Sequence, residues 1–139
     1  MPACALLCSG AMVVDARALE LSGRGLKIAV WLSAIVAAAV FAKSGVEMLA
    51  GAKIGQFEEW GYAPGFSITI GALQLAGAIA LLIPRSSAKA ALALIVVMFG
   101  AVGIHALHGD YLAALAPMLM IALLGFVLFG RGLSEPNHA

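Results

Sequence analysis

The stretch AALALIVVMFGAVGIHALHG at residues 90–109 decides the fold, because it contains no Asp, Glu, Lys or Arg. A helix needs about 20 mostly apolar residues to cross a hydrocarbon core of about 30 Å. Ala and Leu dominate this stretch, and apolar and polar residues do not alternate as they would in the strands of a membrane barrel. The stretch therefore predicts a membrane-spanning α-helix.

Three further stretches have the same character. Residues 28–42, 61–84 and 111–130 lack charged side chains, and the first stays apolar as far as Ala50 in spite of two charged residues. The connections are short and contain Pro and Gly, so consecutive helices should run antiparallel. We predict an all-α polytopic membrane protein, an antiparallel four-helix transmembrane bundle with helices near residues 26–50, 66–83, 87–108 and 111–130.

The composition supports a membrane protein and excludes other classes. Of the 139 residues, 63% are hydrophobic and 11% are charged, whereas an average soluble domain has about 25% charged residues. Eight Lys and Arg with seven Asp and Glu cannot cover the surface of a soluble domain. A soluble globular enzyme, a disordered chain and a nucleic-acid-binding protein with a basic face are therefore excluded. The partner that composition predicts is the lipid bilayer.

Lysine and arginine are distributed unevenly between the two sides. Six of the eight lie before or at the start of the first span, in the 84–89 connection or directly after the fourth span, and the opposite side has Lys53 with three acidic residues. The positive-inside rule then predicts that both termini are cytoplasmic. The predicted segments are a cytoplasmic N-terminal extension at 1–25, a transmembrane domain at 26–131 and a cytoplasmic tail at 132–139.

Two segments outside the spans carry distinctive side chains. Residues 52–63 include Phe57, Trp60 and Tyr62, and we expect them to lie along the outer interface with the rings at headgroup level. Cys4 and Cys8 are the only cysteines. They would share one face of a helix, as a redox pair or half of a metal site, or they are incidental thiols in a reducing cytoplasm.

Charged and amide side chains inside the spans are the first candidates for a functional site. Lys43 and Glu47 are spaced to pair on one helix face. They either reach toward the outer interface or form one wall of a polar pocket. Gln74 has small neighbours on its helix, so it could donate a hydrogen bond across a close helix contact. The residues predicted to pack against other helices are Gly45, Gly71, Gly77 and Ala78.

Two histidines end the third span. His105 and His108 lie on roughly one face, and Asp110 follows in the turn. They would anchor the helix end through hydrogen bonds, or handle a proton or a ligand. A haem held by two histidines needs ligands on facing helices, and no other span contains His. All these groups fall in the outer half of the bundle, so we predict a polar recess there formed by Gln74, His105, Glu47, Lys43 and His108.

The motifs GVEMLAG at 45–51, FEEWG at 57–61, GALQLAGAIALLIPR at 71–85 and GAVGIHAL at 100–107 resemble those of the DoxX-like family of small four-helix membrane proteins. The resemblance covers roughly residues 32–131. Two positions depart from the family pattern, because Met48 replaces its Lys and Gln74 replaces its Glu. The resemblance implies that this Lys and Glu normally pair across helices, since losing only one would leave a buried charge unpaired.

The resemblance also implies a place in the bacterial inner membrane and a set of functions. Founding members resemble membrane subunits of a thiosulfate:quinone oxidoreductase, and other relatives are linked to redox complexes or to receptor assembly. Our first hypothesis is a non-catalytic accessory subunit of a quinone-linked redox complex. The alternatives are an assembly or chaperone-like protein and a small-molecule binding protein or carrier. The sequence indicates no catalytic or metal residues and no cofactor motif, and it leaves quinone contact, a redox-enzyme partner and homo-oligomers open.

Overall fold

The computed structural model describes the backbone of residues 3–134 and the side chains of residues 22–131. Its elements are α1 (Ala3–Leu49), α2 (Ile54–Glu59), α3 (Pro64–Leu82), α4 (Pro84–Leu107) and α5 (Tyr111–Ser134). Four helical segments are long and apolar enough to cross a membrane: Ser22–Leu49, Pro64–Leu82, Pro84–Leu107 and Tyr111–Arg131. The predicted all-α membrane bundle is thus confirmed, and no strand occurs within residues 3–134.

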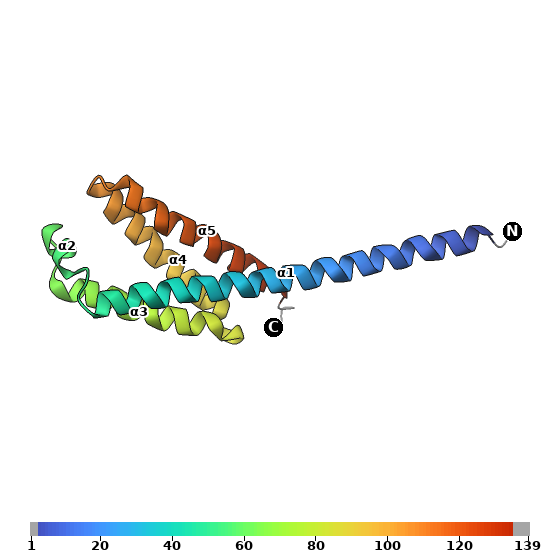
Figure 1. The fold of residues 1–139 in the computed structure, drawn as a ribbon, viewed down its shortest axis with the longest axis horizontal. Helices are drawn as coiled ribbons and strands as arrows, with labels where there is room; N and C mark the ends of the chain where they lie inside the picture. Colours follow the sequence, from blue (N-terminus) through green and yellow to red (C-terminus); the bar gives the residue numbers. More distant parts are fainter. Residues whose placement is uncertain (1–2, 135–139) are drawn as a thin grey trace.

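The first helix is longer than the span it contains. α1 begins at Ala3, so the segment predicted as an N-terminal extension continues the membrane-spanning helix without a break and projects well beyond the bundle (Figure 1). The side chains of Cys4 and Cys8 lie outside the described part of the chain. Residues 4–27 contain no Pro that would end the helix.

Proline and glycine mark the helix ends more sharply than the apolar pattern does. α3 and α4 begin at Pro64 and Pro84, two or three residues before the predicted starts. Proline suits the first turn because its missing N–H would have no helical partner there. Gly51, Gly61 and Gly109 have positive φ angles between 73° and 85° and terminate α1, α2 and α4, a conformation that glycine adopts without steric cost.

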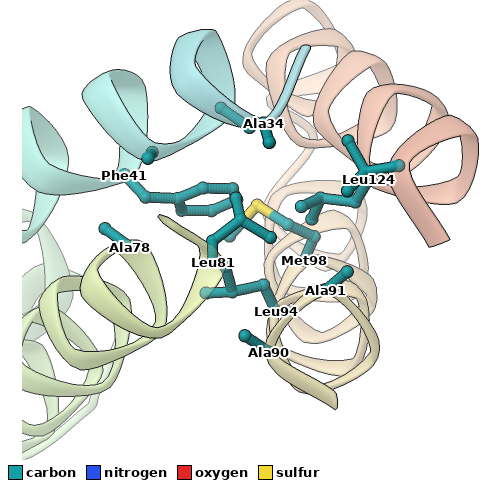
Figure 2. Packing of buried hydrophobic residues seen from close by; sticks show 12 residues of the cluster. Ala34, Phe41, Ala78, Leu81, Ala90, Ala91, Leu94, Met98 and Leu124 are labelled. Carbon is teal, nitrogen blue, oxygen red and sulfur yellow. The ribbon is translucent and has the colours of Figure 1, made fainter. Parts of the chain in front are cut away.

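The helices form a closed ring in which α1 contacts α3 and α5, and α4 contacts the same two helices. The core lies where side chains from all four meet (Figure 2). Phe41 and Leu81 are 2% and 0% exposed and are surrounded by small residues and by Met98. The labelled core residues are Ala34, Phe41, Ala78, Leu81, Ala90, Ala91, Leu94, Met98 and Leu124.

The small residues predicted to pack against other helices do so against two different neighbours. A Cβ atom on Gly45 would lie 2.8 Å from the backbone oxygen of Gly71, so α1 and α3 are in near-backbone contact. Gly77 faces α4 instead, where a Cβ atom would lie 2.6 Å from Leu94 Cδ2. Ala78 is 3% exposed in the core. These small residues bring three helices together in the way that membrane helices commonly associate.

The two ends of the bundle differ in charge. One end, which we call the acidic end, carries α2 and the α4–α5 turn with Glu58, Glu59 and Asp110 (Figure 1). The other, the basic end, carries the α3–α4 turn and the end of α5, with Arg24, Lys27, Arg85, Lys89 and Arg131. The fold therefore gathers five of the seven Lys and Arg residues with described side chains at one end, and the cytoplasmic location of that end stays a prediction.

Candidate functional site

A cavity of about 180 Å³ lies beneath α2, between α3 and α4. Its walls are mostly aromatic and aliphatic, and its two polar side chains are Gln74 and His105. Gly100 and Ala101 of α4 leave the space that larger side chains would fill. The residues that line this cavity, which we call the aromatic cavity, are Met48, Phe57, Trp60, Phe66, Ile70, Gln74, Val97, Gly100, Ala101, Ile104 and His105.

Gln74 is the buried polar group of this site. It is 4% exposed, and its Oε1 atom is buried without a hydrogen-bond partner. Leaving such an acceptor unpaired costs about 1–3 kcal/mol, so a molecule that donates a hydrogen bond from the cavity would recover that cost. The amide also carries two N–H donors, which allows one side chain to serve both a carbonyl and a hydroxyl group.

His105 forms the second polar wall and is held from two sides. Its Nδ1 atom lies 3.6 Å from Asp110 Oδ2, a distance that exceeds hydrogen-bonding range. Nδ1 is accordingly buried without a hydrogen-bond partner. The Trp60 ring meets the imidazole edge-on with the ring centroids 5.4 Å apart. Asp110 and Trp60 therefore flank His105 at the cavity wall.

The short helix α2 closes the cavity with aromatic rings. Phe57 is 8% exposed and contacts the Phe66 ring at 5.6 Å, and Trp60 stacks on His108 at 4.7 Å. Phe57 and Trp60 thus turn inward onto the end of the bundle, and the location of these rings at headgroup level stays a prediction. Phe57 and Trp60 are three residues apart, with Glu58 and Glu59 between them. This pattern was the sequence signal for an amphipathic helix.

A second cavity of about 450 Å³ adjoins the first, bounded by residues of α1, α4 and α5. We call it the polar cavity, because Lys53, Gln56 and Asp110 line it near the acidic end. Pro117 also lines it and has no N–H to bond the carbonyl of Ala113, another lining residue. The residues that line both cavities are Met48, Gln74, Ala101 and His105.

The structure brings two of the five predicted recess residues to the cavity walls. Gln74 and His105 line both cavities, and His108 reaches the site only through its stack on Trp60. Lys43 and Glu47 pair on the outer face of α1, with Nζ and Oε1 3.5 Å apart and side chains 79% and 46% exposed. Neither lines either cavity. Lys43 and Glu47 lie about 140° and about 100° around the helix from Met48, which lines both.

Met48 is the cavity residue that reasoning from chemistry missed. It faces α3, where a Cβ atom on Gly71 would lie 2.7 Å from Met48 Cβ. Met48 and Gln74, the two positions that depart from the family pattern, thus line the same two cavities from facing helices. Among the described residues that line the aromatic cavity there is no Asp, Glu, Lys or Arg. A ligand there would meet a neutral amide and an imidazole.

Four antiparallel apolar helices around a partly polar cavity define a small polytopic membrane protein. A model of the DoxX-like family matches residues 28–127, and the chain belongs to this family. No curated protein and no solved structure matches the chain. Within the described residues, no three His, Cys, Asp or Glu side chains are grouped to hold a metal ion.

Proposed function

We propose that the protein is a non-catalytic membrane subunit that holds the headgroup of a quinone or quinol in the aromatic cavity, as an accessory to a membrane redox complex. The observation that carries the proposal is the unpartnered Oε1 of Gln74 at the wall of the aromatic cavity. A quinol hydroxyl can donate to this oxygen, and a quinone carbonyl can accept from the same amide.

The volume of the aromatic cavity limits the class of ligand that it can hold. An apolar protein cavity of about 150 Å³ binds benzene, and the aromatic cavity measures about 180 Å³. It therefore admits one substituted ring and is too small for a haem or a flavin. The rings of Trp60 and Phe66 supply faces and edges against which such a headgroup can pack.

Ligand binding can be tested with Trp60 as a fluorescent reporter. The protein has two tryptophans, so Trp31→Phe leaves only the one that lines the cavity. We expect a short-tailed ubiquinone analogue to quench Trp60 saturably in detergent, and Gln74→Leu to weaken binding about tenfold, as expected for one lost hydrogen bond to a desolvated group. Gln56→Leu is the matched control, because Gln56 lines the polar cavity alone. Equal effects of the two variants would contradict the assignment.

The accessory role needs a separate measurement. The native protein, purified in mild detergent and analysed by mass spectrometry, should retain both quinone and a redox enzyme. Recovery of quinone without a redox enzyme would favour the second candidate, a small-molecule carrier. The observation that favours the carrier is the polar cavity, which joins the aromatic cavity at Gln74 and His105 and leads toward Lys53 and Asp110 at the acidic end.

A further inference from the structure

At the basic end, α1 and α5 approach each other through a glycine. A Cβ atom on Gly130 would overlap Val30, so only glycine permits this contact. Figure 1 shows the end of α5 meeting α1 at this point. The next residue, Arg131, is thereby placed against Trp31, with the guanidinium carbon 4.4 Å from the ring centroid.

The guanidinium of Arg131 is only partly satisfied. The side chain is half-buried, and its Nε and Nη2 atoms are buried and form no hydrogen bond with the residues that the structure describes. Stacking on Trp31 offsets part of the lost hydration, but the N–H groups point outward in the guanidinium plane, where a planar acid or phosphate group binds best. A permanently charged guanidinium with buried, unpaired N–H groups would be stabilised by a bound anion.

A cavity of about 190 Å³ opens beside these atoms, lined by Lys27, Val30, Trp31 and Arg131. Lys27 lies one helical turn before Trp31, so a second cation faces the same space. The acidic residues with described side chains are all in the other half of the bundle, and none lines this cavity: Glu47, Glu58, Glu59 and Asp110. Among the described residues, Arg131 and Lys27 thus have no acidic partner at this cavity.

We propose that this cavity binds the phosphate headgroup of an anionic phospholipid. Arg131 would hold the phosphate through two N–H groups, and Lys27 would add a second charge. A lipid fits better than a free anion, because the cavity lies near the end of the span Ser22–Leu49 and exposed apolar side chains continue from it. Ile35, one turn beyond Trp31, is 49% exposed and would contact the acyl chain. This site is independent of the aromatic cavity at the other end.

The test uses the full-length protein in a zwitterionic detergent, with retained lipid counted by native mass spectrometry. The probes are short-chain phosphatidylglycerol, phosphatidylcholine with the same chains, and inorganic phosphate as a competitor. We expect one phosphatidylglycerol to bind about tenfold more tightly than phosphatidylcholine, and millimolar phosphate to leave it bound. Arg131→Gln should weaken phosphatidylglycerol binding about tenfold, whereas Arg85→Gln, which removes an equal charge at the same end, should change it less than about twofold.

Each alternative result overturns the proposal in a distinct way. Equal losses from Arg131→Gln and Arg85→Gln would indicate diffuse surface attraction. Displacement by inorganic phosphate would indicate an anion site without lipid selectivity, and equal affinity for phosphatidylcholine would remove the role of headgroup charge. If Arg131→Gln fails to fold, Lys27→Gln provides the test, because Lys27 is exposed and its replacement should not disturb folding. We expect that variant to lose about threefold in affinity, and an unchanged affinity would overturn the site.

Discussion

The same face of α4 is packed in one half of the bundle and hollow in the other. Leu94 is 2% exposed and fills the core, and Met98, 5% exposed, packs in the core and borders the polar cavity. One and two turns beyond Met98, Ala101 and His105 line both cavities. α3 shows the same change, from Leu81 and Ala78 in the core to Gln74 at the cavity walls.

The packed half of α3 and α4 supports stability, and the hollow half offers space for a ligand. The packed half uses aliphatic side chains that interlock with small neighbours, so each methyl group contributes contacts. The hollow half places a small residue, Ala101, where a large one would fill the space, and it keeps an unpaired amide beside the void. Substitutions of matched chemistry should therefore have opposite consequences in the two halves.

The largest effect is expected from a cavity created in the packed half. Leu81 is 0% exposed, and Leu81→Ala should lower the free energy of unfolding by about 2–5 kcal/mol. Unfolding by sodium dodecyl sulfate in mixed micelles measures this change. Leu92→Ala provides the control, because Leu92 is 55% exposed toward lipid and should cost well below about 1 kcal/mol. A similar loss from both variants would show that the core does not dominate stability.

The sharpest contrast between the halves comes from the same substitution made in each. Ala91 is 0% exposed in the core, so Ala91→Leu should overpack it and cost about 1–3 kcal/mol. Ala101→Leu enters the cavity region and should leave stability unchanged or raise it by about 0.5–2 kcal/mol. It should also weaken binding of the ubiquinone analogue at least about tenfold. Comparable destabilisation by the two variants would mean that the hollow half is packed in solution.

In the hollow half, α1 and α3 meet through the contact of Gly45 with Gly71. A methyl group on Gly45 would lie 2.8 Å from the backbone oxygen of Gly71, so Gly45→Ala should separate α1 from α3 and cost about 1–2 kcal/mol. Gly103→Ala is the matched control, because nothing lies within 4 Å of its Cβ position, and helix propensity favours alanine there. Equal stability of the two variants would contradict the close contact.

The sequence predicts the bundle well because lipid leaves the backbone few alternatives. Apolar stretches must be helical, and short connections with Pro and Gly make them antiparallel. Gln74 and His105 were also predictable as recess residues, since polar atoms in a span must face the protein interior. The inward turn of Phe57 and Trp60 depends on tertiary contacts with Phe66 and His108. The spacing of Phe57 and Trp60 indicates an amphipathic helix, but local periodicity does not indicate which residues they contact.

The smallest effect is expected from the Lys43–Glu47 pair, the charged pair inside a span. Replacing both with Gln removes two opposite charges and leaves the net charge of +1 unchanged. Both side chains are at least 46% exposed and lie 3.5 Å apart within one helix. Exposed pairs of this kind contribute less than about 0.5 kcal/mol. Because neither residue lines a cavity, quinone binding should change less than about twofold in the double variant. A larger loss, measured by quenching of Trp60, would place this pair in the recess and extend the hollow half to the outer face of α1.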